Sequence, residues 1–470
     1  MTEKTYEAME RYGRDVRAAF HTPGHKMGLG AHERLRRLLT EEGLRQEVNV
    51  TDALDDLNSP TGAIKDAEEF AAKLYGADRS LFMVNGTTGA IQTMVLGALK
   101  DGDLLIAPRN AHRSVFGAAA LAGIDIAYMS PEINEDFQII EEVRTETVRK
   151  AIEEHPTAKA VLIISPTYYG RFSDIEGIAK VVHEHNMLLL VDEAHGPHLP
   201  FVPGLPKSAI SRGADLVASS THKILGALTQ GSILFVNEDR VDFKKMAQTA
   251  AMLTTTSPNQ LIVASLEIAM EQMVKYGKEY FTKLLPLIAD LQKGLKKAGF
   301  EILEGEDLDP FKLTVRISDF GVSGKKADKI LIDKYGVAAE LSNLHNLLFL
   351  ITYADNEETL GILKNSLIDF IKDKEKHGVN MDFPKLPKIP PSKILPRKAF
   401  FADFKEVPFK ESAGQVSAEE ITSYPPGIPL IHPGEVITKE IIKYAKEVHS
   451  LGIKLVGFGD HTLETVRVIR

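Results

Sequence analysis

Residues 219–236 read "SSTHKILGALTQGSILFV", in which a polar turn with Lys223 stands before an apolar run. A lysine between two buried elements is costly unless it is paired, neutral or covalently used. The run "SILFV" (232–236) is apolar throughout, as is typical of a strand that helices cover on both faces. The stretch therefore predicts a buried sheet with a lysine placed for chemistry at its edge.

Other apolar runs of this kind alternate with helical-looking segments. They are "SLFMV" (80–84), "DLLIAP" (103–108), "IDIAYM" (124–129), "AVLIIS" (160–165), "LLLVDEA" (188–194) and "DLVASS" (215–220). This alternation predicts an α/β domain with a mostly parallel central sheet. Because open sheets of this type bind ligands beyond the carboxyl ends of their strands, the polar residues directly after each run are the candidate site.

The rest of the chain predicts further domains. Residues 257–300 have apolar residues at helical spacing, and residues 310–370 mix strand-like and helical segments, as in a smaller α+β domain. The segment 380–398 is rich in proline and lysine, which marks a linker. We expect four parts: a large domain over 1–256, a small domain over 257–379, the linker over 380–398, and a C-terminal domain over 399–470.

Composition narrows the class of protein. The chain has 470 residues, 44% of them hydrophobic, and can bury a large core. Its 56 Lys and Arg against 65 Asp and Glu give a net charge of -9, which disfavours nucleic acid and membrane surfaces as partners. The N-terminus lacks an apolar signal segment, and no stretch approaches the ~20 apolar residues of a membrane span. The lack of cysteine excludes disulfides and thiolate metal sites and fits a reducing cytoplasm, so a metal would have to be bound by His and carboxylates. We expect a cytoplasmic protein and no metal site.

Two strand ends carry groups of opposite charge. Asp192 follows one apolar run with His195 close behind, and Ser220, His222 and Lys223 follow another. The carboxyl ends of parallel strands meet at one edge of a sheet, so we expect the acid and the lysine in one crevice. The alternative is that Asp192 caps the next turn and its histidines lie on the surface.

Two further strand ends add an anion site and a ring. In "NGTTG", Gly86 permits close backbone approach, and Thr87 and Thr88 offer hydroxyls before a helix expected to begin near Ala90, where free N–H groups favour an anion. His112 follows another strand end. The alternatives are an N-cap with a tight turn in the first case and a capping histidine in the second.

Pyridoxal 5′-phosphate requires this combination of groups. The cofactor needs a lysine for covalent attachment, a carboxylate that keeps its ring nitrogen protonated, and a phosphate site, and it benefits from a planar group stacked on its ring. The residues then take these roles: Lys223 holds the cofactor, Asp192 contacts its ring nitrogen beside His195, Gly86, Thr87, Thr88, Ser220 and His222 bind its phosphate, and His112 stacks on its ring. The proton donor to the substrate stays open among Lys223, His222 and His195.

Six blocks of the sequence resemble the Orn/Lys/Arg decarboxylases. They are "FHTPGHKMG" (20–28), "NGTTGAI" (85–91), "PRNAHRS" (108–114), "VDEAHG" (191–196), "STHK" (220–223) and "YPPGIPLIHPGE" (424–435). The resemblance covers nearly the whole chain in the expected order. Within this family the chain is most similar to the short, Gram-positive-type biosynthetic arginine decarboxylases.

The resemblance implies the aspartate-aminotransferase-like fold, known as fold type I, and pyridoxal phosphate-dependent decarboxylation. Arginine is the first-choice substrate, agmatine the product and polyamine synthesis, including spermidine, the pathway; lysine and ornithine are the alternatives. It also implies a homodimer with shared active sites, in which "DDLNSPTG" (55–62) and "LTTTSP" (253–258) lie near the interface, or are ordinary polar loops.

For the distal cation of the substrate, Glu435 is the expected partner, because a guanidinium or ammonium calls for a carboxylate. The alternative is that Glu435 caps the following helix. Two other functions stay open: another aminotransferase or lyase of the same fold, and an inactive protein of this fold that serves as a binding partner. The retained Lys223 and Asp192 disfavour the inactive protein.

Overall fold

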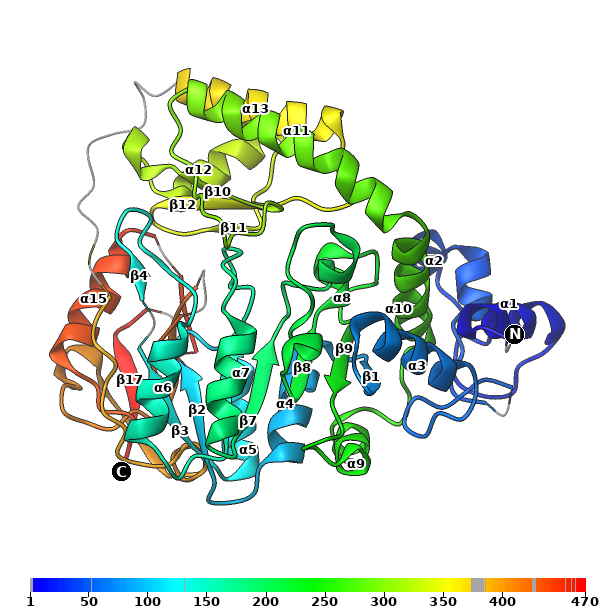
Figure 1. Cartoon of the computed structure of the whole chain (residues 1–470), viewed down its shortest axis with the longest axis horizontal. Coiled ribbons are helices and arrows are strands. Elements are labelled where there is room, and N and C mark those ends of the chain that lie inside the picture. Colours follow the sequence, from blue (N-terminus) through cyan, green and yellow to red (C-terminus); the bar gives the residue numbers. More distant parts are fainter. Residues whose placement is uncertain are drawn as a thin grey trace. The chain divides into compact units, whose positions relative to one another are not determined.

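The computed structural model describes residues 3–51, 53–130, 132–372, 384, 386–424, 428–452, 454–457, 459–460 and 462–470 (Figure 1). The chain divides into two compact units. The first consists of Met1–Ala98 and Leu190–Glu279, and the second of Leu99–Leu189 and Tyr280–Arg470. The domain boundaries that we expect at residues 256, 379 and 398 stay a prediction.

The central sheet has the strand order β1-β9-β8-β7-β6-β2-β3. Its strands are β1 (Arg79–Met83), β2 (Leu104–Pro108), β3 (Asp125–Met129), β6 (Ala160–Ile164), β7 (Leu188–Asp192), β8 (Leu216–Ser219) and β9 (Ser232–Val236). The pairs β7–β8, β2–β3 and β2–β6 are parallel, whereas β9 runs antiparallel to β8 and β1. The predicted α/β class and mostly parallel sheet are confirmed, and every predicted strand of this sheet is present.

Helices of the first unit cover its strands with apolar side chains, and α4, which is apolar on most sides, is covered in turn by a further helix. Helix α4 (Gly86–Ala98) packs on β8 and β9, and α3 (Ala63–Tyr75) packs on β1. Further helices of this unit are α1 (Thr5–Asp15), α2 (Glu33–Gln46), α9 (Phe243–Leu253) and α10 (Gln260–Gln272). Helix α4 begins at Gly86 and not near Ala90, so the glycine and threonine residues form its first turn.

The second unit surrounds strands β6, β2 and β3 with α5 (Arg113–Ala122), α6 (Thr145–Glu154) and α7 (Ile175–Glu184). It also contains a smaller antiparallel sheet of order β10-β12-β11. The elements of this part are β10 (Lys312–Arg316), β11 (Leu341–Ser342), β12 (Asn346–Leu350), α12 (Gly324–Ile330) and α13 (Glu357–Lys372), with α11 (Lys278–Lys297) leading into it. The smaller α+β part was predicted from the sequence.

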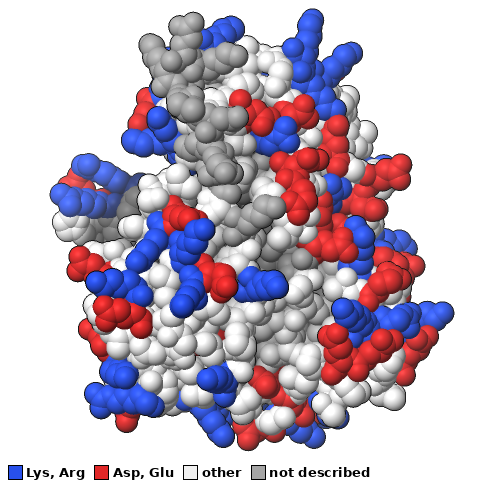
Figure 2. Space-filling model, turned by 90° about the vertical axis from the view of Figure 1, so that its left-hand side faces the viewer, with Lys and Arg blue, Asp and Glu red and all other residues white. Residues whose placement is uncertain are grey.

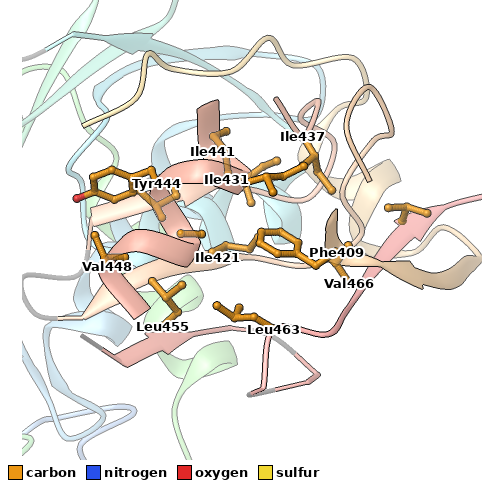
Figure 3. Close-up of a cluster of buried hydrophobic side chains, with 14 of the residues drawn as sticks. Phe409, Ile421, Ile431, Ile437, Ile441, Tyr444, Val448, Leu455, Leu463 and Val466 are labelled. Atoms are coloured by element: carbon orange, nitrogen blue, oxygen red, sulfur yellow. The ribbon is translucent and has the colours of Figure 1, made fainter. Parts of the chain in front are cut away.

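The C-terminal part has its own apolar core (Figure 3). Its elements are α14 (Pro396–Phe400), β13 (Phe404–Pro408), β14 (Ile421–Tyr424), β15 (Ile428–Ile431), α15 (Lys439–Ser450), β16 (Lys454–Val456) and β17 (Thr465–Ile469). Phe409, Ile431 and Ile441 are fully buried within this core. Helix α14 begins inside the expected linker, whose residues 380–383 and 385 lie outside the described residues.

Candidate active site

Strand register brings the ends of three strands to one edge of the sheet in the first unit. Asp192 at the end of β7 lies opposite Ala218, which pairs with Leu234 of β9, which in turn pairs with Leu81 of β1. The segments that continue β7, β8 and β1 therefore leave the sheet at the same edge. They carry Asp192, Lys223 in the short helix α8 (Thr221–Ile224), and the first turn of α4.

Lys223 and His195 are in direct contact at this edge. Lys223 Nζ lies 2.9 Å from His195 Nε2, and the imidazole is buried while the lysine is half-buried. His222, the neighbour of Lys223, has its Nδ1 2.9 Å from the Gly231 carbonyl oxygen, which fixes its ring. The predicted lysine thus has a histidine with which it can share a proton.

Asp192 is buried, with an exposed fraction of 5%, and its Oδ1 accepts a hydrogen bond from the Ala194 N–H over 3.1 Å. The contact with Ala194 is a turn-capping one, as the alternative interpretation held. However, the following histidines are not on the surface, because His195 and His198 are both buried. Asp192 therefore places a carboxyl group in a buried, polar edge of the sheet.

Sequence reasoning missed Glu193, which is fully buried beside Asp192. Its carboxylate accepts hydrogen bonds from Ser208 Oγ at 2.6 Å and from the Ala209 N–H at 2.7 Å. Burial raises the pKa of Glu193 to about 8. The sequence held one signal for Glu193, because it is a second acidic residue directly after an apolar strand. A buried segment tolerates such a residue only where hydrogen-bond partners are present.

The first turn of α4 carries the hydroxyls expected to bind phosphate. The Thr87 hydroxyl is hydrogen-bonded to the Ser220 hydroxyl and lies 2.8 Å from Ser232 Oγ. Thr87 and Ser220 are buried, and Thr88 is exposed. Sequence reasoning also missed Ser232, whose only signal was a polar residue at the start of an apolar strand.

The geometry of this turn fits a phosphate group. Gly86 has a φ of +75° and open space where a side chain would stand, so an anion could approach the N–H end of helix α4. At Gly89, by contrast, a Cβ would lie 2.0 Å from Asn85 Oδ1, which explains the second glycine. The residues present therefore fit the phosphate end of pyridoxal 5′-phosphate.

His112 and Glu435 belong to the second unit. His112 caps α5, with its Nδ1 2.8 Å from Ser114 Oγ and 3.3 Å from the Ser114 N–H. The capping interpretation of His112 is thus correct. Its stacking role stays a prediction.

Glu435 forms a buried ion pair with Arg109, which sequence reasoning missed. Arg109 Nη1 and Nη2 donate to the two carboxylate oxygens over 2.5 and 2.8 Å. The cap of α15 is Thr438, whose hydroxyl accepts from the Ile441 N–H, so the helix-capping alternative for Glu435 is wrong. Its role toward the substrate stays a prediction, now with an arginine of the same chain as a competing partner.

The motif at 20–28 and the two polar loops lie in the first unit. His25 Nε2 lies 2.7 Å from Glu47 Oε2. Asp55 accepts backbone N–H groups at the start of α3, including those of Thr61 and Gly62. Asn58 Nδ2 donates to the Thr255 carbonyl oxygen, so the loops 55–62 and 253–258 are in contact. Their place near an interface stays a prediction.

The described residues show neither a metal site nor a membrane-spanning helix. Among them, no group of His, Asp and Glu is arranged to hold a metal ion. None of the helices described has the length and apolar character of a membrane span. On the face drawn in Figure 2, basic and acidic side chains lie among one another.

Comparison with known proteins shows the family of this chain. Residues 4–306 match the family model "Orn/Lys/Arg decarboxylase, major domain", and residues 387–467 match "Orn/Lys/Arg decarboxylase, C-terminal domain". The arginine decarboxylase of Bacillus anthracis is 37% identical over 96% of this chain and 94% of its own. That of Bacillus subtilis is 36% identical over 99% of this chain and 97% of its own.

The fold likewise matches a solved structure. The crystal structure of the Francisella novicida lysine decarboxylase has a TM-score of 0.87 and 23% sequence identity, and the alignment covers 100% of this chain and 81% of that one. This likeness confirms the fold.

Proposed function

Because the chain belongs to the Orn/Lys/Arg decarboxylase family, we propose that it uses pyridoxal 5′-phosphate to convert L-arginine to agmatine and carbon dioxide. The observation that carries the proposal is the shared sheet edge, where Asp192, the Lys223–His195 pair and the first turn of α4 come together. Relatives named arginine decarboxylase at 36 and 37% identity support arginine over lysine and ornithine.

Each residue has a defined task in this proposal. When bound, the cofactor supplies a protonated pyridine ring that accepts the electron pair left when the Cα–carboxylate bond breaks. Lys223 Nζ holds the cofactor covalently, and the Asp192 carboxylate keeps the ring nitrogen protonated. The first turn of α4 and the Ser220 hydroxyl bind the phosphate, and His112 covers the ring face.

A proton must reach Cα after carbon dioxide leaves. Lys223 Nζ is the donor that fits best, because His195 Nε2, 2.9 Å away, can return a proton to it. His222 is less suited, because its Nδ1 is held at the Gly231 carbonyl oxygen. His195 therefore exchanges protons with the lysine and does not act on the substrate directly.

The same family membership supports a homodimer in the cytoplasm that supplies agmatine for polyamine and spermidine synthesis. Large apolar side chains of the N-terminal segment are exposed in the single chain: Phe20 at 94%, Leu29 at 78% and Leu38 at 79%. Such side chains are typical of a surface that another subunit covers.

The test is direct. Purified protein should absorb visible light as a pyridoxal enzyme does, and borohydride reduction should abolish this absorbance and leave a pyridoxyl label on the peptide with Lys223. Lys223→Ala should lose the label and carbon dioxide release, whereas Lys207→Ala, an exposed lysine of the same unit, should keep both. Radiolabelled arginine, lysine and ornithine should be assayed in parallel. A protein that takes up no pyridoxal phosphate would defeat the proposal.

A further inference from the structure

The C-terminal part contacts the chain on both sides of His112, and we call these contacts the grip. Three residues before it, Arg109 donates from Nη1 and Nη2 to Glu435, and from Nε to the Pro429 carbonyl oxygen over 3.1 Å. Four residues after it, Phe116 stacks on His432 with ring centroids 4.4 Å apart and an angle of 1° between the rings. All of these contacts lie within the second unit.

The side chains that form the grip are buried and also contact one another. The side chains of Arg109 and Glu435 are 6% and 3% exposed. The His432 N–H donates to Glu435 Oε2 over 2.7 Å, and Tyr128 lies beside both Arg109 and His432. Burial, together with the charge of Arg109, holds the pKa of His432 well below its usual range, so its ring packs in the neutral form.

The backbone hydrogen bonds of this segment are few among the described residues. Arg109 N–H donates to the Met129 carbonyl oxygen and Ala111 N–H to that of Pro108, after which His112 starts α5. A bidentate arginine–carboxylate pair fixes orientation as well as distance. Its partner Glu435 is itself held by its backbone, because its N–H donates to the His432 carbonyl oxygen and its carbonyl oxygen accepts from the Ser417 N–H.

We propose that Glu435, through Arg109, is a positioning residue that fixes the segment carrying His112, and does not bind the substrate. The inference rests on the proposed function only for the part played by His112. It assigns the C-terminal part a task that its sequence did not reveal, which is to fix the backbone on both sides of His112. A residue that binds the distal cation would need its carboxylate available, whereas both oxygens of Glu435 accept hydrogen bonds from Arg109.

The experiment compares Glu435→Gln with Glu447→Gln, an exposed carboxylate of α15 in the same part of the chain. Hydrogen exchange of residues 109–116 should quicken at least tenfold in Glu435→Gln and stay unchanged in Glu447→Gln. Cofactor retention is measured by dialysis against a series of free pyridoxal phosphate concentrations, with absorbance read in the absence of substrate. Glu435→Gln should need at least tenfold more free cofactor than the wild-type protein to retain it. In a His112→Ala background, Glu435→Gln should change this requirement by less than twofold.

A substrate-binding Glu435 would give a different result. KM for arginine would then rise at least tenfold, with exchange of 109–116 and cofactor retention unchanged, and that outcome overturns the inference. If Glu435→Gln does not fold, Arg109→Lys gives the same test, because an ammonium keeps the charge but cannot pair with both oxygens. If the wild-type protein takes up no cofactor, the proposed function fails. The inference about Glu435 is tested separately, because unchanged hydrogen exchange of residues 109–116 in Glu435→Gln would refute it with or without cofactor.

Discussion

Glu193 makes the stability of this protein depend on pH in a direction that can be worked out. Burial raises its pKa to about 8 in the folded state, against 4.5 for an ordinary glutamate. Between these values the folded chain holds a proton that the unfolded chain has released, so the free energy of unfolding falls as pH rises from 4.5 to 8. At about 1.4 kcal/mol per pH unit, the full loss is about 5 kcal/mol.

Substituting Glu193→Gln removes this loss and keeps the shape of the side chain. The amide oxygen can still accept from the Ala209 N–H, and the amide N–H can donate to Ser208 Oγ. We expect the variant to match the wild-type protein near pH 4.5 and to exceed its free energy of unfolding by up to about 5 kcal/mol at pH 8. Urea unfolding followed by circular dichroism at half-unit pH steps measures this difference.

The control is Glu184→Gln, because Glu184 is an exposed glutamate at the end of α7. This variant should follow the wild-type pH dependence throughout. Parallel curves for Glu193→Gln and the wild-type protein between pH 5 and 8 would refute the reasoning, since another group would then be the one that titrates.

Two further predictions concern a second titrating group and the cofactor. Burial, and the charge of Arg316, lower the pKa of His345 to about 4, so the wild-type protein should lose up to about 3 kcal/mol of unfolding free energy as pH falls from 6.5 to 4. His345→Gln should reduce that loss in urea unfolding, and an unchanged acid limb would contradict the assignment. Asp192→Asn should lower carbon dioxide release from arginine at least about 100-fold, because an amide does not hold a proton on the ring nitrogen. Near-normal turnover with normal cofactor content would remove Asp192 from the mechanism.

Local sequence was sufficient to predict the strands of the central sheet and the shared position of Asp192 and Lys223 at their ends. The strands of the central sheet are uninterrupted apolar runs, and the polar residues at their ends share an edge because parallel strands end together. That rule predicts that Asp192 and Lys223 lie at one edge of the sheet. The contact between Lys223 and His195 follows from the same rule.

The missed residues depend on contacts between segments far apart in the chain. Arg109 and Glu435 are separated by 326 positions, and nothing in either local sequence indicates the other. Ser232 acquires its role only when β9 places it beside Thr87. The start of α4 was misjudged because glycine and threonine are typical of a turn, whereas packing on β8 and β9 favours helix from Gly86 onward.

The hydroxyls around Thr87 form a chain of hydrogen bonds that can run in one direction only. Ser232 donates its single hydrogen to the Ser219 carbonyl oxygen, so Thr87 must donate to Ser232, and Ser220 must donate to Thr87. If this turn binds the cofactor phosphate as proposed, the phosphate meets Ser220 with its hydrogen turned inward. Rotating that hydrogen outward breaks only the outermost bond and leaves the others in place, so the hydroxyl can be released to an anion at the cost of a single link.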